Sequence, residues 1–406
     1  MIALQRTISY LQLLAGSVLF LCTPFFYNNI TRWSLFLFAG LSVIDCIVNK
    51  RYQNNPIFSL QKLPFWACIV YYLLQFIYYP MEQDLQHWSF LAENRLSFLI
   101  FGILGLLGAP VIKAKHLSFL SIAGSLGIIG YLLYNTDLTT TYWIESMNAF
   151  RAQHVQAHML VNMFMNIAIA CCFWRIKKQT NWYKTALYVA LIALFFGFIY
   201  LSGGRSGAIG SGVVVIIGLL YLFKQYTYLK YICSFIIAVC LVGVMYIANK
   251  KENDLSRFEN NLRFTIWHET LHVIKEQPII GYGASTAASK IATTFAQSEQ
   301  IKKDTFLIEH AQSDTIVGAH PHNQLLHGIL EYGIAGLLCA LVLLFGPITY
   351  TLLNKSNIML TALCLAIVIQ LQTDVIRGAF GDFSFQYYLL FIMAYAQQSA
   401  KKVICG

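Results

Sequence analysis

The sequence predicts an all-α, polytopic integral membrane protein. Hydrophobic residues make up 57% of its 406 positions, charged residues make up only 11%, and the mean hydropathy is +0.59. Soluble domains carry about 25% charged residues, so this composition excludes a soluble fold. Apolar runs long enough to cross a bilayer recur along the chain, which indicates many spans rather than a single anchor.

Run length and hydropathy predict twelve membrane-spanning helices. The first is interpreted as a span and not as a signal peptide, because no small-residue cleavage site follows it. We expect nine spans within residues 1–248, a long external loop at 249–323, and three spans with a cytoplasmic tail at 324–406. The spans are predicted at residues 7–26, 33–48, 63–80, 95–110, 116–134, 155–174, 184–201, 207–223, 229–248, 324–351, 358–374 and 384–399.

The net charge of +10 is explained by orientation in the membrane and predicts no nucleic-acid partner. With a cytoplasmic N-terminus, fifteen lysines and arginines fall on the inner side, and they include Lys115, Arg175 and Lys178. The short outer segments hold only five, namely Arg32, Arg95, Arg151, Arg205 and Arg377. This excess is the positive-inside pattern, so both termini are predicted in the cytoplasm and the long loop outside it.

The long loop is patterned as helices rather than as low-complexity sequence. Leu262, Ile266 and Val273 form an apolar stripe on a helix that Pro278 ends, and a glycine-rich turn follows at 281–283. We expect this amphipathic helix to lie on the membrane surface. A second helical stretch is expected at about residues 284–311.

Two arginines on the outer side are candidates for anion binding. Arg205 lies in SGGRSGAIGSG between the seventh and eighth spans, and Arg263 lies on the amphipathic helix one turn before Trp267. The small residues around Arg205 are spaced for close helix packing, whereas an arginine at membrane depth usually faces a polar cavity or an anion. For Arg263, a contact with lipid headgroups is an equal alternative. Two guanidinium groups that converge would suit a pyrophosphate.

The segment HPHNQLLHGILEYG, residues 320–333, gathers three histidines, and three interpretations stay open. His320 and His322, with His310 or His327, could form a metal site, although this cluster lacks the cysteine or His-Glu-x-x-His spacing typical of zinc. The segment could be a polar helix end capped by Asn323. An imidazole here could also accept a proton from a sugar hydroxyl at neutral pH. The ten cysteines lie in predicted spans or in the tail, so no external disulfide framework is expected.

Carboxylates in apolar sequence are further candidates. Glu331 and Asp374 lie near the outer ends of their spans, and such groups are functional candidates by default. A structural role would be to pair with an arginine such as Arg377, or to orient a histidine. Asp45 has no assigned role, and His154 with His158 could face one cavity or form a structural pair.

The order of these motifs resembles the bacterial O-antigen ligase family of the O-antigen ligase/polymerase superfamily. The resemblance rests on SGGRSG, then NLRFTIWHETLHVIKEQPIIGYG, then HPHNQLLHGILEYGIAG. The last segment fits the family pattern of His, then Asn, Ser or Gln, nine residues, Gly, two residues and Gly, with His322, Asn323, Gly333 and Gly336. The motifs cover about a third of the chain. Gly-Gly before Arg205 departs from the Thr or Ser often found there.

The resemblance implies a type-C glycosyltransferase-like fold and an enzyme of the bacterial inner membrane, with its site on the periplasmic face. It implies transfer of O-polysaccharide from undecaprenyl pyrophosphate to lipid A–core without a metal or other cofactor. Arg205 and Arg263 would hold the donor pyrophosphate, and His322 would be the general base. By the same resemblance, His320, Asn323, Trp267 and Asp374 are expected to contact substrate.

Three other functions remain open at this stage. Two belong to the same superfamily, an O-antigen polymerase and a protein O-oligosaccharyltransferase, and the His-Asn pattern favours the ligase over both. The third is a flippase or transporter of polyprenyl-linked glycans. Transporters of that kind are typically built from repeated halves with broken helices, and no such repeat is visible in this sequence.

Overall fold

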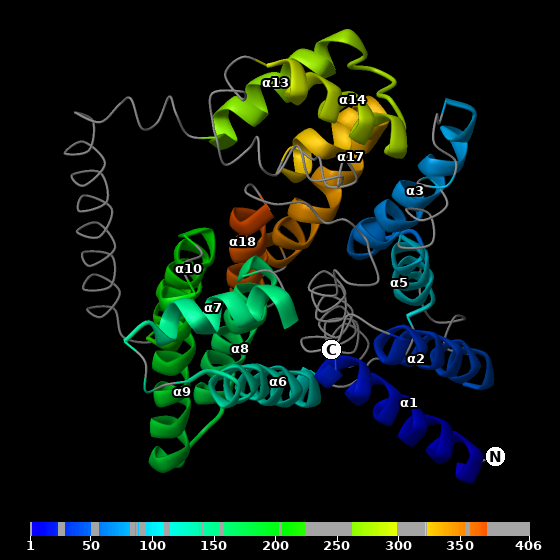
Figure 1. The fold of residues 1–406 in the computed structure, drawn as a ribbon. Helices are drawn as coiled ribbons and strands as arrows, with labels where there is room; N and C mark the ends of the chain where they lie inside the picture. The colour runs from blue at the N-terminus through cyan, green and yellow to red at the C-terminus, as the bar shows by residue number, and fades with distance from the viewer. Residues whose placement is uncertain are drawn as a thin grey trace.

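The computed structural model describes residues 2–22, 29–49, 57–81, 86, 88, 95–108, 114–137, 139, 141–154, 158–202, 205–223, 262–298, 321, 323–353 and 358–371. All regular structure in these ranges is helical (Figure 1). The all-α prediction is therefore confirmed for the part of the chain that is described.

Ten helices coincide with predicted spans. They are α1 (Ile2–Cys22), α2 (Asn29–Val48), α3 (Leu63–Ile77), α5 (Leu96–Leu107), α6 (Ala114–Tyr134), α8 (His158–Ile176), α9 (Trp182–Leu201), α10 (Arg205–Leu222), α17 (Gln324–Leu353) and α18 (Ile358–Leu371). Short 3-10 turns at Leu60–Lys62 and Tyr79–Met81 flank α3. The predicted spans at 229–248 and 384–399 lie outside the described residues.

Three of these helices are long and apolar enough to cross a membrane, namely Lys115–Tyr134, Trp182–Leu201 and Gln324–Thr349. Five shorter apolar helices accompany them in the described ranges. Helix α9 has 20 residues, which corresponds to about 30 Å, the thickness of a hydrocarbon core. Only 17% of its apolar window is buried, so most of its surface faces away from the protein. A helical membrane protein is supported, and the total of twelve spans stays a prediction.

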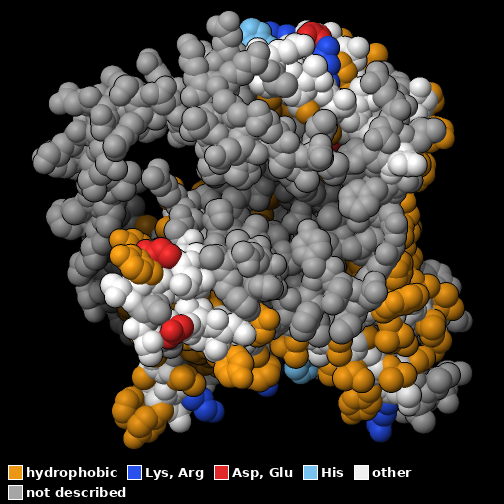
Figure 2. Space-filling view, in the orientation of Figure 1, with side chains coloured by type: hydrophobic (Ala, Val, Ile, Leu, Met, Phe, Trp, Pro, Cys, Tyr) orange, Lys and Arg blue, Asp and Glu red, His pale blue; other side chains and the backbone are white. Residues whose placement is uncertain are grey.

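Helix α17 connects the parts of the structure. It packs against α3 on one side and against α18 on the other, and α18 in turn packs against α10 and α8. Helices α1, α2 and α6 lie together at the lower edge of Figure 1. Figure 2 shows hydrophobic side chains along one flank of the molecule, while Lys and Arg side chains appear at its lower edge and at its top.

Helices α13 (Leu262–Glu276) and α14 (Ala284–Gln297) form a hairpin at the upper end of α17 (Figure 1). The predicted turn at 281–283 is confirmed, and the second helix ends at Gln297 within the longer stretch that the sequence suggested. Burial and the adjacent Glu276 carboxylate raise the pKa of Tyr282 to about 12. Its hydroxyl therefore keeps its proton and donates to the Val273 carbonyl at 3.0 Å.

The apolar stripe of α13 packs against protein, and its expected position at the membrane surface stays a prediction. Val273 and Ile274 are 1% and 6% exposed, and they join Ile291 of α14 and Leu330 of α17 in a small separate core. Leu271 points elsewhere and is 45% exposed. Packing against α17 removes these side chains from water and fixes the hairpin at the same time.

Helix α7 (Trp143–His154) was not expected from the sequence. Its twelve residues mix charged, polar and apolar side chains, so run length and hydropathy carry no signal for it. It precedes α8 and contacts both α6 and α8.

Candidate functional site

Helix α17 breaks near its N-terminal end, and this break organises the candidate site. Tyr332 (φ −130°, ψ 21°) and Gly333 (φ 57°, ψ −142°) leave the helical conformation. The angles of Gly333 fall in a region that side chains with a Cβ rarely adopt. A Cβ at Gly333 would also collide with the carbonyl of Ile279. Gly333, which the sequence marks as part of the family pattern, is therefore a position where the helix breaks.

The α13–α14 turn is attached at this break by backbone hydrogen bonds. The amide of Tyr282 donates to Leu330 at 3.0 Å, and that of Gly283 donates to Glu331 at 2.8 Å. In the other direction, the amide of Ile334 donates to Ile279 at 3.2 Å. The broken turn of α17 thus exposes backbone groups that the hairpin satisfies. The helix that carries Arg263 and Trp267 is fixed to the helix that begins directly after His322 and Asn323.

A buried polar cluster lies beneath the break. The Arg95 guanidinium approaches Glu331 with 2.5 Å between Nη2 and Oε1, and each residue is only 1% exposed. Tyr71 donates its hydroxyl hydrogen to Glu331 Oε2 at 2.9 Å. Arg95 Nη1 donates to the hydroxyl of Tyr332 at 2.7 Å. Residues from α3, the start of α5 and α17 therefore meet at a single carboxylate.

His327 is the third charged or chargeable partner of this carboxylate. It lies one helical turn before Glu331, and its Nε2 is 3.2 Å from Glu331 Oε1. A carboxylate this close to an imidazole orients the ring. The sequence suggested that Glu331 pairs with an arginine such as Arg377 or orients a histidine. Arg377 lies outside the described residues, and the described partners are Arg95 and His327.

Asn323 caps α17 as one of the three interpretations of its segment proposes. Its side-chain oxygen accepts hydrogen bonds from the amides of Leu325 at 3.0 Å and Leu326 at 3.2 Å. A cap of this kind satisfies amides that the first turn leaves without helical partners. It also fixes the direction in which the chain enters the helix.

The start of α10, where Arg205 is the first residue, is held tightly against α8. A Cβ at Gly207 would meet Asn162, and one at Gly210 would lie 3.1 Å from Asn166. Asn162 also accepts a hydrogen bond from the hydroxyl of Ser202 at 2.8 Å. The close-packing interpretation is confirmed for Gly207 and Gly210. This close packing leaves the first turns of α10 little freedom to move relative to α8.

The structure describes only some of the predicted site residues. Arg205 and Arg263 are placed as backbone in the first turns of α10 and α13, and their side chains lie outside what is described. Trp267 is half-buried on α13. His320, His322 and Asp374 fall outside the described residues, as do the side chains of His154 and His158. Asp45 is buried in α2 and accepts a hydrogen bond from Asn49 at 2.7 Å, which fits a structural role.

Helix α13 carries a His-Glu-x-x-His motif, His268 to His272, that the sequence analysis did not consider. The two imidazoles lie one turn apart with 4.6 Å between ring centroids. Glu269, the position of the general base in zinc peptidases, instead accepts a hydrogen bond from Ser298 at 2.9 Å. No group of three potential ligands occurs among the described residues. The motif could have been found from spacing alone, and its described part lacks a third ligand.

Arg95 and His327 were also missed as members of a cluster. The sequence counts Arg95 only as an outer cation and His327 only as one of the three histidines in residues 320–333. No spacing rule links two residues that are more than 230 positions apart, so the cluster was visible only in the fold.

Comparison with known proteins gives a family match for the central part of the chain. Residues 189–341 match the family described as O-antigen ligase. The resemblance to the O-antigen ligase family is therefore confirmed. The matched segment includes Arg205, Arg263 and Trp267 and extends through the histidine segment to the break of α17, while Asp374 and Arg95 lie outside it.

One relative extends the comparison. An uncharacterized protein of Haemophilus influenzae (strain ATCC 51907 / DSM 11121 / KW20 / Rd) is 27% identical over 223 residues. The aligned part covers 49% of this chain and 52% of the relative, so the chain spans about half the length of the relative that it matches. The apolar helices indicate a membrane protein, and residues 189–341 are similar to the O-antigen ligase family.

Proposed function

We propose that this protein is an O-antigen ligase of the bacterial inner membrane. It transfers O-polysaccharide from undecaprenyl pyrophosphate to a sugar of lipid A–core at the periplasmic face. The observation that carries the proposal is the extent of the family match, because residues 189–341 contain both candidate arginines and the histidine segment.

The proposed reaction is a displacement at the anomeric carbon of the donor sugar. His322 accepts the proton of the acceptor hydroxyl, the acceptor oxygen forms the new glycosidic bond, and the bond from the anomeric carbon to the pyrophosphate oxygen breaks. Undecaprenyl pyrophosphate leaves with the electron pair, and the guanidinium groups of Arg205 and Arg263 stabilise its charge. Base assistance of this kind contributes roughly 100- to 10,000-fold in rate. No metal takes part in the proposed reaction.

The fold supports this proposal by fixing the elements that carry the three residues. The hairpin with Arg263 is hydrogen-bonded to the break of α17, and α17 begins after His322. Helix α10, which begins at Arg205, contacts α18, and α18 contacts α17. Charged and proton-accepting groups stabilise a transition state most when they are already in position before the reaction.

The remaining candidate residues have supporting roles in the proposal. His320 and Trp267 contact the sugars or the lipid phosphates, and Asp374 contacts the acceptor. Asn323 acts mainly by capping α17, because its side-chain oxygen already accepts two backbone hydrogen bonds.

Single alanine variants at Arg205, Arg263 and His322 test the proposal in a strain that makes lipopolysaccharide. Each is expected to insert normally and to abolish the attached polysaccharide ladder, because each removes charge stabilisation or the base. Lys290→Ala, which removes an exposed cation of the same hairpin, is the matched control and should leave the ladder intact. A full ladder in the His322→Ala strain would remove His322 from the role of base.

A further inference from the structure

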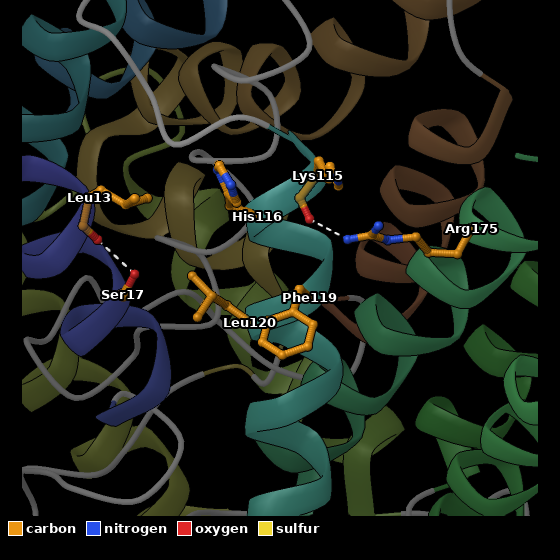
Figure 3. A pocket seen from close by; sticks show the side chains of 7 residues that line it. All are labelled: Leu13, Ser17, Lys115, His116, Phe119, Leu120 and Arg175. Carbon is orange, nitrogen blue, oxygen red and sulfur yellow. Dashed lines mark hydrogen bonds between the residues drawn. The ribbon is translucent and has the colours of Figure 1, made fainter. Parts of the chain in front are cut away.

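A cavity lies between α1, α6 and α8, away from the break of α17 (Figure 3). Its volume is about 330 Å³, which is within the range of roughly 300–1,000 Å³ that is usual for small-molecule sites. The charge asymmetry of the sequence predicts that these ends of α6 and α8 lie on the cytoplasmic side. The cavity is therefore separate from the proposed periplasmic site.

Three basic side chains line this cavity. Lys115 and His116 come from the first turn of α6, and Arg175 comes from the last turn of α8. Arg175 is held in place because its Nε donates to Ser118 at 2.9 Å. Its Nη2 also donates to the Lys115 carbonyl at 2.5 Å (Figure 3). An anchored guanidinium beside an exposed lysine is a fixed positive site rather than a pair of freely moving charges.

These cations have no carboxylate partner in the described part of the chain. The ion pairs found there join Arg95 and His327 to Glu331, and Lys290 to Glu276, at other places in the fold. Burial and the neighbouring Arg175 charge lower the pKa of Lys178, which shows that positive groups crowd this end of α8. An anion in the cavity would relieve this repulsion.

The opposite wall of the cavity is apolar. Leu13 comes from α1, and Phe119 and Leu120 come from α6 below the basic residues (Figure 3). Phe119 is 64% exposed although it is large and aromatic. Ser17, the remaining polar residue of the wall, donates its hydroxyl hydrogen to the Leu13 carbonyl at 2.7 Å. The lining thus changes from cationic to apolar within one cavity, as a charged headgroup with attached acyl chains requires.

We propose that this cavity binds the phosphate headgroup of an anionic membrane phospholipid, with one acyl chain against Leu13 and Phe119. The basic residues supply the attraction, and the apolar wall selects a lipid over a free anion. The positive-inside pattern explains why cations are common on this side, but it does not explain a cavity that places Lys115 and Arg175 beside apolar lining residues.

The test uses the full-length protein purified in a nonionic detergent, with thermal stability and native mass spectrometry as readouts. The probes are phosphatidylglycerol, phosphatidylcholine with the same acyl chains, and inorganic phosphate. The variants are Lys115→Gln, His116→Gln and Phe119→Ala. Lys184→Gln is the matched control, because it removes an exposed cation that is also predicted on the inner side but lies outside the cavity.

Phosphatidylglycerol is expected to raise the melting temperature of the wild-type protein and of Lys184→Gln, and to stay bound in the mass spectrometer. Lys115→Gln should weaken its apparent affinity roughly fivefold, because one cation near a lipid surface contributes about that factor. Phe119→Ala should weaken the binding of long-chain lipid and leave the effect of inorganic phosphate on the melting temperature unchanged. Equal effects of phosphatidylcholine, equal effects of inorganic phosphate, or equal weakening by Lys184→Gln would each overturn the proposal.

Discussion

Arg95 and Glu331 form an ion pair across 236 positions of sequence, with 2.5 Å between Nη2 and Oε1. The side chains of Arg95 and Glu331 are only 2% and 1% exposed, so water does not screen the pair. The same carboxylate contacts Tyr71 and His327. Through Arg95 and Tyr71, this carboxylate joins α5 and α3 to α17. Helix α17 begins two residues after the proposed base, His322, in the sequence.

Glu331→Gln is expected to destabilise the protein strongly. It leaves the buried Arg95 charge without its partner, and breaking such a pair typically costs about 3–5 kcal/mol. The melting temperature of the purified variant measures this effect. Glu276→Gln, an exposed carboxylate on α13, is the control and should change the melting temperature little. If the two variants melt together, the pair does not stabilise the fold.

A double variant separates the cost of the unpaired charge from the value of the pair. Arg95→Met combined with Glu331→Gln should be more stable than Glu331→Gln alone, because it removes the orphaned guanidinium. Additive losses in the double variant would show that the two residues act independently.

Gly333→Ala is expected to detach the α13–α14 hairpin from α17. A Cβ would collide with Ile279, and the backbone angles of Gly333 cost an ordinary residue about 1–3 kcal/mol. Limited proteolysis should cut between residues 249 and 323 faster in the variant than in the wild type. Gly130→Ala, at a position with no atom within 4 Å of the added carbon, is the matched control. Unchanged cleavage of Gly333→Ala would contradict the role of the break.

Asn323 can be tested as a cap separately from any contact with substrate. Asn323→Ala should cost about 1 kcal/mol and lower activity, whereas Asn323→Asp and Asn323→Ser should keep much of both because their side chains also cap. Stability and ligation are measured on the same preparations. Full stability with lost activity in the serine variant would assign Asn323 a direct contact with substrate.

Ligation is expected to survive EDTA, because the proposed reaction stabilises the leaving pyrophosphate with arginines. The measurement compares polysaccharide transfer before and after chelation and after addition of zinc. Loss of transfer that only zinc restores would contradict the proposal, and it would direct attention to His268 and His272 on α13.

Much of the fold follows from one-dimensional patterns. Apolar runs predicted ten of the helices, because hydropathy alone decides which segments enter a bilayer. The glycine turn at 281–283 and the cap at Asn323 followed from local chemistry that needs only a few adjacent residues. Helix α7 was not predicted because its polar sequence has neither a long apolar run nor a local turn or cap signal.

The parts that sequence could not supply depend on distant contacts. The stripe of α13 has the same pattern whether it packs against lipid or against α17, so periodicity could not decide between them. The partner of Glu331 could be any outer arginine until the fold brought Arg95 to it. Gly333 matched a family pattern, but only its backbone angles show that it breaks the helix.

Reconstitution of the purified protein in liposomes with the two lipid substrates tests the central claim most directly. The proposal predicts that polysaccharide moves covalently from undecaprenyl pyrophosphate to lipid A–core, and that His322→Ala folds and inserts but does not transfer it. Elongation of the donor chain without attachment would indicate a polymerase, and movement across the bilayer without a new bond would indicate a flippase. Either result, or undiminished transfer by His322→Ala, would contradict the proposal.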